Sequence, residues 1–222
     1  MELLVGPLTD IRPFKLILPE IKKFKSPLAE KLFLKLNQFI DGKHIGIFVS
    51  GGIDSAILYF LLLEENLRTG NKFNIVPYTI RRMGAEQSAR NVIRWIHDFY
   101  NIPDIDLNIV GDPSLPEIQQ VESGVNDVLG VRADYVYLGI IYDRPEHSLN
   151  WDRFKFVETF KNRYPFLHLE KTHILDLYIK KNVLELLKLT HSCNTNIDTD
   201  CMICNGCQAK IWAFNKMGLR TE

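Results

Sequence analysis

Residues 48–55, Phe-Val-Ser-Gly-Gly-Ile-Asp-Ser, place two glycines, two hydroxyls and a carboxylate in one short stretch. An apolar run precedes this stretch and a helical pattern follows it, so the polar residues fall where a strand gives way to a helix. Glycines permit a tight turn whose successive N–H groups point into one concavity, and such a concavity binds anions. The N-terminus of the following helix adds unpaired N–H groups and the positive end of its dipole. The pattern therefore predicts a phosphate-binding loop.

The side chains of this loop suit different parts of a polyphosphate. The hydroxyls of Ser50 and Ser55 are neutral donors for phosphate oxygens. Asp54 is an anion, so its expected role is either to cap the helix N-terminus or to hold a Mg²⁺ ion shared with the phosphates. The loop lacks the Gly-Lys-Ser/Thr ending of a Walker A loop and the glycine spacing of dinucleotide binders. An ordinary strand–helix connection is the alternative, and the complete Ser-Gly-Gly-x-Asp-Ser pattern argues against it.

All the cysteines of the chain lie within residues 193–207, and they are Cys193, Cys201, Cys204 and Cys207. In a reducing compartment such a cluster favours a metal over disulfides. Thiolates separated by two residues converge on one ion, and four of them close a tetrahedral Zn²⁺ site. An iron–sulfur cluster is the alternative, because ferredoxin-like ligation uses the same spacing. Four thiolates already complete a site, so we expect His191 not to be a ligand.

Alternating strand and helix patterns surround the loop. Short apolar runs predict strands at 44–49, 73–78, 105–110 and 134–141, and helical periodicity predicts helices at 26–40, 54–65, 85–100 and 116–129. The polar residues 142–152 predict a loop, and the pattern of residues 153–190 is mostly helical. Repeated strand–helix–strand units indicate an α/β fold, a Rossmann-like open parallel sheet with helices on both faces.

Composition narrows the classes of function. The chain has 222 residues, with 27 basic and 27 acidic side chains and a formal net charge of zero. A neutral chain lacks the electrostatic footprint of a nucleic-acid binder, so we expect small-molecule substrates and no nucleic-acid partner. The N-terminus lacks a signal pattern and no long uncharged apolar stretch occurs, so we expect no membrane association and a cytoplasmic location. Homodimerisation is left open.

The loop at residues 50–55 resembles the signature of the PP-loop (N-type) ATP pyrophosphatases. That resemblance implies an adenine nucleotide alpha hydrolase-like fold and cleavage of ATP between its α- and β-phosphates. AMP is transferred to a substrate oxygen, and pyrophosphate leaves. The resemblance also implies ATP and Mg²⁺ as ligands. The residues that it implies for nucleotide binding are Phe48, Ser50, Gly51, Gly52, Asp54, Ser55, Tyr78 and Gly139.

The C-terminal part is similar to the 7-cyano-7-deazaguanine synthases of that superfamily. Their pattern of Thr-x-Ser-Cys, further cysteines and a closing Ala-Phe matches residues 190–214, and in that family the four cysteines hold a structural zinc. The segment 165–171 (PFLHLEK) resembles a Pro-Leu-to-Lys segment that places Lys171 near the phosphates. Residues 136–139 (VYLG) resemble the strand that ends beside the nucleotide. The likeness covers about residues 44 to 214.

The resemblance implies an ATP-dependent ligase of a queuosine-type pathway, which forms a C–N bond. It would convert 7-carboxy-7-deazaguanine, with ammonia, to an amide and then to a nitrile. The expected catalytic residues are Asp54, Lys171 and Arg81. Arg82 and Arg153 are further candidates for holding the substrate or the leaving pyrophosphate, although a surface salt bridge is the simpler role for each arginine.

Departures from the family pattern concern the acceptor more than the ATP chemistry. Met202 stands where the family has glycine, and residues 80–83 (IRRM) lack the family's Gln and His. Residues 142–153 lack its Gly-Tyr-Pro-Asp-Cys-Arg substrate segment. The alternatives are therefore an enzyme that stops at the amide, one that uses a protein amine as acceptor, a tRNA thiolation enzyme, and an ATP-binding protein without turnover.

The expected organisation has three parts that together make one compact domain. Residues 1–43 are an N-terminal extension, 44–150 are the PP-loop nucleotide-binding core, and 151–222 are a helical C-terminal region that carries the four-cysteine metal site. The first part precedes the first predicted strand and matches nothing in the family pattern.

Overall fold

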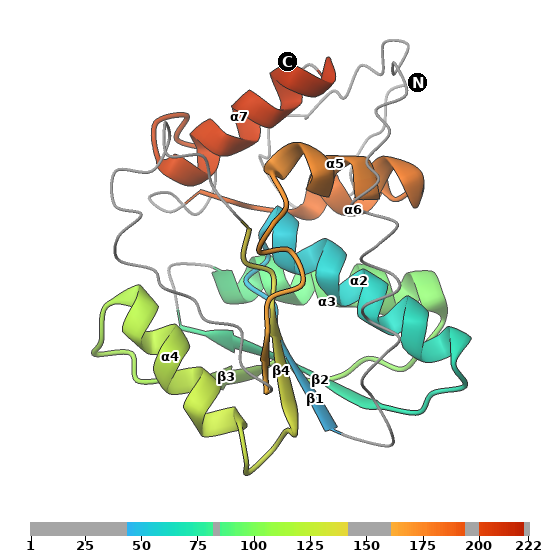
Figure 1. Ribbon diagram of the computed structural model, residues 1–222, viewed down its shortest axis with the longest axis vertical. Coiled ribbons are helices and arrows are strands. Elements are labelled where there is room, and N and C mark those ends of the chain that lie inside the picture. Colours follow the sequence, from blue (N-terminus) through green and yellow to red (C-terminus); the bar gives the residue numbers. More distant parts are fainter. Residues whose placement is uncertain (1–43, 82–84, 142–160, 194–199, 220–222) are drawn as a thin grey trace.

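The chain folds around a five-stranded sheet with the strand order β3-β2-β1-β4-β5, and every pair is parallel (Figure 1). The computed structural model describes residues 44–81, 85–141, 161–193 and 200–219. The strands are β1 His44–Phe48, β2 Asn74–Ile80, β3 Asn108–Val110, β4 Tyr135–Leu138 and β5 Asn162–Arg163. The chain proceeds from β1 through β2 to β3 and then returns to place β4 on the other side of β1. This reversal creates a switch point between β1 and β4, where open parallel sheets bind their ligands.

Helices cover both faces of the sheet (Figure 1). One face carries α4 (Glu117–Val128), and the other carries α2 (Ile53–Arg68) and α3 (Ala85–Tyr100). Alternation along β1 explains the two layers, because successive side chains of a strand point to opposite faces. Ile45 and Ile47 belong to the core beneath α2 and α3, whereas Phe48 belongs to the core beneath α4.

A second helical layer lies over α2 and α3 on the side away from the sheet (Figure 1). It consists of α5 (Lys171–Lys180), α6 (Leu184–Leu189) and α7 (Asn205–Met217). In this layer α5 packs on α2, α6 packs on α3 and α7 packs on α5. The layer therefore presents the C-terminal part of the chain to the helix that follows the glycine-rich loop.

Two ion pairs join α5 and α2 along their length. Lys171 pairs with Asp54 and Lys181 pairs with Glu64, each at 2.5 Å and each across 117 residues of sequence. Because both partners advance by ten residues from one pair to the next, the two helices run side by side in the same direction. A buried hydrogen bond of 2.7 Å, from the hydroxyl of Tyr178 to the carbonyl of Ile53, ties α5 to the first residue of α2.

The predicted fold class is confirmed, with differences at the level of individual elements. Helix α3 has the predicted bounds 85–100, α2 continues three residues beyond its predicted end at 65, and β3 and β4 are shorter than expected. The two-residue β5 and the helix α7 were not predicted as elements, and β5 interrupts the stretch expected to be mostly helical. The helix expected at 26–40 lies outside the described residues. No helix of the described residues is long and apolar enough to cross a membrane.

Replacing Tyr178 with Phe tests the tie between α5 and the start of α2. Its hydroxyl is fully buried and hydrogen-bonded, so its removal is expected to lower the free energy of unfolding by about 1 kcal/mol. Tyr100→Phe is the control, since the described residues offer the buried Tyr100 hydroxyl no hydrogen-bond partner. Urea denaturation of both variants should show a loss for Tyr178→Phe alone, and equal losses would contradict the assignment.

Candidate functional site

The glycine-rich loop lies at the carboxyl end of β1, beside the switch point of the sheet. The chain leaves β1 at Phe48 and enters α2 at Ile53, so residues 49–52 make the whole connection. The N–H of Val49 still donates to the carbonyl of Tyr78 on β2, at 2.8 Å, which fixes the start of the connection to the sheet. The loop is thereby held at the edge where the strand order reverses.

Gly51 occupies a position that no other residue can take without displacing its surroundings. Its φ is +78°, in the left-handed region that side chains disfavour. A Cβ atom added there would lie 2.5 Å from the Cβ of Ser88 and 2.7 Å from the backbone nitrogen of Ala89. Both neighbours belong to α3, so the loop is pressed against the backbone of that helix. The predicted glycine turn is thus a requirement of packing as well as of conformation.

Gly139 makes a second close approach on the other side of the loop. It follows β4 directly, and a Cβ there would lie 2.8 Å from the carbonyl carbon of Asp54 and 2.8 Å from the nitrogen of Ser55. The chain leaving β4 therefore passes directly over the first turn of α2. This contact brings the predicted residue Gly139 to the loop, although 84 and more residues separate them in sequence.

The hydroxyls of Ser50 and Ser55 have different surroundings in the loop. Ser55 is buried, and its Oγ accepts a hydrogen bond from the N–H of Ser50 at 3.1 Å and lies 3.2 Å from the Gly52 carbonyl. The Oγ atoms of Ser50 and Ser55 are 3.0 Å apart. Ser55 therefore holds the shape of the loop, while Ser50 is exposed and its Oγ also accepts a hydrogen bond from the N–H of Gly52 at 3.3 Å.

The N-terminus of α2 is left without a side-chain cap. Gly52 is the N-cap residue and makes no capping hydrogen bond, so the first N–H groups of α2 lack an acceptor from their own helix. Asp54 lies in the first turn, and its expected alternative role as N-cap is therefore wrong. An uncapped helix N-terminus at a glycine-rich turn is suited to bind an anion.

Asp54 and Lys171, both predicted as site residues, meet at this N-terminus. The Nζ of Lys171 lies 2.5 Å from Oδ2 of Asp54, and the two side chains are only 8% and 20% exposed. The other carboxylate oxygen, Oδ1, is buried and has no hydrogen-bond partner among the described residues. Asp54 thus has a free oxygen of the type that Mg²⁺ prefers, and Lys171 supplies a positive charge beside the loop.

Other predicted residues lie at the same end of the sheet in different surroundings. Phe48 and Tyr78 are buried, with ring centroids 6.2 Å apart, and burial raises the pKa of Tyr78 above its ordinary value. A contact of either residue with a ligand would have to use its backbone. Arg81 follows β2, and its exposed guanidinium lies 3.9 Å from Glu86. Arg82 and Arg153 lie outside the described residues.

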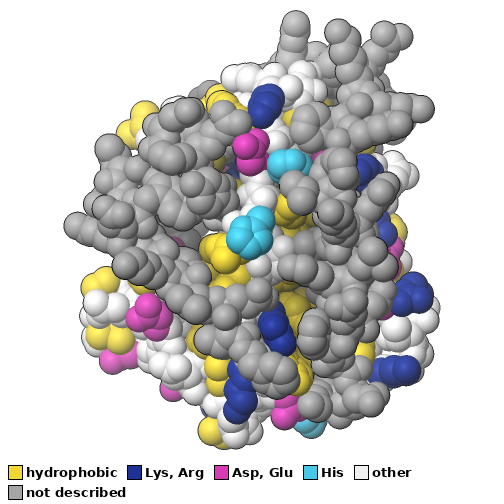
Figure 2. Space-filling model, in the orientation of Figure 1, with side chains coloured by type: hydrophobic (Ala, Val, Ile, Leu, Met, Phe, Trp, Pro, Cys, Tyr) yellow, Lys and Arg dark blue, Asp and Glu magenta, His cyan; other side chains and the backbone are white. Residues whose placement is uncertain are grey.

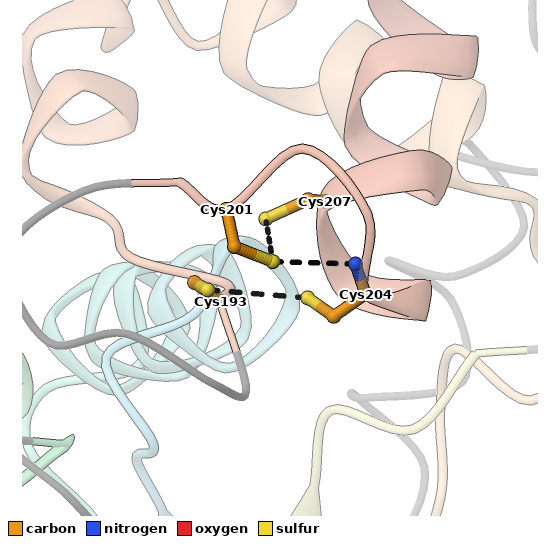
Figure 3. Close-up of side chains that lie close together, drawn as sticks. All are labelled: Cys193, Cys201, Cys204 and Cys207. Atoms are coloured by element: carbon orange, nitrogen blue, oxygen red, sulfur yellow. Dashed lines mark hydrogen bonds between the residues drawn. The ribbon is translucent and has the colours of Figure 1, made fainter.

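The four cysteines converge on one point, as the sequence predicted (Figure 3). Their sulfur atoms all lie within 4.8 Å of one another, and the Cys201–Cys207 and Cys193–Cys204 pairs are each 4.0 Å apart. These separations exceed a disulfide bond, and all four cysteines are free. The backbone N–H of Cys204 donates to the sulfur of Cys201 at 3.2 Å, which orients that sulfur toward the shared centre.

The sulfur positions fit a single metal ion. Four thiolates around one Zn²⁺ at the usual bond length are about 3.8 Å apart. In a cubane iron–sulfur cluster each thiolate binds a different iron, so the sulfurs stand further apart than around one ion. Burial raises the pKa of the Cys207 thiol, while a hydrogen bond with the Met202 backbone acts in the opposite direction. A cation bound by the four sulfurs would stabilise the thiolate form.

Met202, in the turn between Cys201 and Cys204, has a left-handed backbone with φ +64°. This is the position at which the resembling family has glycine, the residue that adopts this conformation freely. The departure noted in the sequence therefore carries a conformational strain. The Nε2 of Gln208 donates a hydrogen bond to the Met202 carbonyl and helps to hold this turn against α7.

A short strap connects the cysteine cluster to the loop, and the sequence did not predict it. The strap is residues 190–193, from the end of α6 to Cys193, and the N–H of His191 donates to the carbonyl of Gly51 at 2.9 Å. The Nδ1 of His191 lies 3.9 Å from Asp200, which in turn accepts a bond of 2.8 Å from the buried Lys210. The group of converging candidate ligands in the described part of the chain consists of the four cysteines.

Charged side chains on the visible face are mixed in sign. Figure 2 shows lysine and arginine side chains interspersed with aspartate and glutamate over the described part of this face. They do not gather into a single basic area among the described residues of that view. This distribution agrees with the neutral composition.

Gly51→Ala tests the close packing of the loop, and Gly70→Ala is its matched control. Both glycines have a left-handed φ, but nothing lies within 4 Å of a Cβ at Gly70. Gly70→Ala should cost about 1 kcal/mol from backbone strain alone. Gly51→Ala should cost at least about 3 kcal/mol, since α3 must also move. Urea denaturation measures both, and a similar cost for the two would show that the loop is not packed against α3.

Cys204→Ser tests the metal centre. Loss of one thiolate should abolish stoichiometric metal in the purified protein and lower its melting temperature, because binding energy of a structural ion is folding energy. Elemental analysis by mass spectrometry and thermal unfolding are the measurements, and we expect one zinc per chain in the unaltered protein. Replacing Ser192 with Ala, next to Cys193, is the control that should keep the metal. Unchanged metal content in Cys204→Ser would rule out the site.

Comparisons with known proteins assign no family to this chain. No protein-family profile and no curated protein matches the sequence. Among solved structures, the chain is similar to the U34-tRNA thiolase NcsA from Methanococcus maripaludis with its [4Fe-4S] cluster. The identity is 12%, the TM-score is 0.48, and the match covers 85% of this chain and 73% of that chain. Similarity at this level assigns neither an activity nor a metal, so the proposal for this chain rests on its own residues.

Proposed function

We propose that this protein is an ATP-dependent, AMP- and pyrophosphate-forming enzyme of the PP-loop ATP pyrophosphatase type. The observation that carries the proposal is the meeting of the Gly51 turn, the uncapped N-terminus of α2 and the Asp54–Lys171 pair at the switch point of a parallel sheet. Each feature alone is common in α/β proteins. Together they supply backbone donors, a helix dipole, a metal ligand and a cation for one polyphosphate.

The groups of the proposed site have different chemical roles toward ATP. The N–H groups of the first turn of α2 bind phosphate oxygens, and the hydroxyl of Ser50 adds a donor. Lys171 stabilises the negative charge that grows on the leaving pyrophosphate. Asp54 would hold Mg²⁺ through its carboxylate, and the ion, when bound, neutralises phosphate charge. No nucleophilic side chain is required, because positioning and charge stabilisation are sufficient for this reaction.

The proposed acceptor is a carboxylate of the 7-carboxy-7-deazaguanine type. Its oxygen attacks the α-phosphorus of ATP, and the bond from that phosphorus to the pyrophosphate oxygen breaks. Ammonia then adds to the acyl carbon, loses a proton, and displaces AMP to give an amide. A second ATP can activate the amide oxygen in the same way, and loss of AMP together with both protons of the amide nitrogen gives a nitrile. Arg81, which follows β2 directly, is the cation that we assign to holding the acceptor.

The support for this acceptor is the combination of loop and cysteine pattern in one chain. The four sulfurs lie at separations that suit a structural zinc, as in the resembling family. The altered segment 142–153, which would contact the acceptor, lies outside the described residues. An enzyme that stops at the amide, or that passes the activated acid to a protein amine, uses the same adenylation site.

Sulfur transfer to tRNA is the second candidate function, and the observation that favours it is the convergence of four cysteines. A thiolation enzyme of this type would be expected to use an iron–sulfur cluster or a redox-active cysteine pair. The sulfur separations of 4.0 to 4.8 Å and the neutral charge of the chain favour the ligase. Brown colour and bound iron after anaerobic purification would reverse that preference.

The reaction can be tested with purified protein, Mg-ATP, ammonium and 7-carboxy-7-deazaguanine, with products followed by liquid chromatography and mass spectrometry. We expect AMP, pyrophosphate and the amide or nitrile. Asp54→Asn should reduce AMP formation by about 100-fold or more, because the metal ligand is lost. Glu64→Gln, which breaks the corresponding ion pair ten residues further along α2, is the matched control and should retain turnover.

The outcomes separate the parts of the proposal. AMP without a modified base would keep the loop chemistry and exclude this acceptor. ADP and phosphate in place of AMP and pyrophosphate would overturn the proposal, and so would full activity in Asp54→Asn.

A further inference from the structure

The ion pair between Asp54 and Lys171 uses one oxygen of the carboxylate that is proposed to bind a divalent cation. Lys171 is the first residue of α5 and Asp54 the second of α2, and their charged atoms are 2.5 Å apart in a largely buried setting. One carboxylate oxygen therefore has a cation partner already. The other oxygen, Oδ1, is buried without a hydrogen-bond partner among the described residues, so it is the atom left for a metal.

A dication that approached Oδ1 alone would meet the ammonium group of Lys171 on the same carboxylate. Mg²⁺ binds carboxylate oxygens at about 2.0–2.1 Å, so the two cations would share one carboxylate and repel each other at close range. Burial strengthens their repulsion, since the side chains are 8% and 20% exposed. The site thus has a free ligand atom but too much positive charge for a free metal ion.

A polyphosphate removes this obstacle because it gives the lysine another partner. If Lys171 transfers its hydrogen bond from Asp54 to a phosphate oxygen, Asp54 regains its full negative charge. The metal ion then meets a carboxylate and several phosphate oxygens. The same exchange works in reverse, since binding of the metal releases the lysine for the phosphate. Linkage requires each ligand to increase the affinity for the other by the same factor.

We propose that the Asp54–Lys171 pair is an interlock that makes divalent-cation binding at Asp54 conditional on a bound polyphosphate. Lys171 acts here as a positioning and specificity-determining residue that excludes free metal from the nucleotide site. The inference rests on the proposed function for the identity of the polyphosphate. It concerns binding, so it is tested without turnover.

Lys171→Met is the central variant, because methionine keeps an apolar stem of similar length and removes the charge. Binding of Mn²⁺ alone is measured by electron paramagnetic resonance, which counts free Mn²⁺ in solution. The variant is expected to bind Mn²⁺ at least tenfold more tightly than the unaltered protein, a gain that a misfolded chain would not give. The double variant Asp54→Asn/Lys171→Met should lose this gain, which assigns the ion to Asp54.

Lys181→Met is the matched control. It breaks the other 2.5 Å ion pair between α5 and α2, ten residues further along both helices, and should leave Mn²⁺ binding unchanged. A gain as large as that of Lys171→Met would show that any broken pair creates a site, and would overturn the proposal. Equal Mn²⁺ affinity of the unaltered protein and Lys171→Met would overturn it as well.

A measurement on the unaltered protein provides an independent test that no folding defect can obscure. Adding α,β-methylene-ATP, whose α–β bridge cannot be cleaved, should tighten Mn²⁺ binding at least tenfold, and Asp54→Asn should remove that effect. Identical Mn²⁺ affinity with and without the analogue contradicts the interlock. If Lys171→Met gains Mn²⁺ at Asp54 but no AMP forms in the assay, the interlock stands and the proposed reaction fails. If AMP forms but Lys171→Met shows no gain in Mn²⁺ affinity, the proposed reaction stands and the interlock fails.

Discussion

The geometry of the site depends on close packing that leaves no room for a Cβ atom at Gly51 or at Gly139. Gly51, which follows β1, lies against the backbone of α3, and Gly139, which follows β4, lies against the first turn of α2. The ends of the two strands are therefore in direct contact with these two helices. Close-packed interiors tolerate little added volume, and backbone atoms are the hardest to move. The turn after β1 is therefore fixed in position by its neighbours, and it holds the uncapped N-terminus of α2 in place before a ligand arrives.

The C-terminal layer depends on the same turn. Lys171 bonds to Asp54, Tyr178 bonds to the carbonyl of Ile53, and the strap from Cys193 bonds through His191 to the carbonyl of Gly51. Helices α5 to α7 and the cysteine cluster thus reach the loop from one side of the molecule, while the sheet reaches it from below. A metal held by the cysteines would keep the strap in place, which connects a structural ion to the geometry of the loop.

Much of this arrangement follows from the sequence, because the features involved are local. Short apolar runs located β1 and β2, helical periodicity located α3, and the cysteine spacing located the metal cluster, since these patterns act within a few residues. The parts that could not be predicted are contacts across long sequence distances. Residues that meet through packing, such as His191 with Gly51 or Tyr178 with Ile53, carry no signal in spacing or composition. The resemblance implied Phe48 and Tyr78 as nucleotide-binding residues, but a strand pattern does not say which face a ligand uses, and both side chains are buried.

The central claim is that this loop directs attack to the α-phosphorus of ATP. The most direct test follows the nucleotide products by ³¹P nuclear magnetic resonance while purified protein turns over Mg-ATP with an acceptor carboxylate and ammonium. The account predicts that signals of AMP and pyrophosphate grow in equal amounts and that none of ADP appears. Growth of ADP and inorganic phosphate signals would place the cleavage between the β- and γ-phosphates and would contradict it.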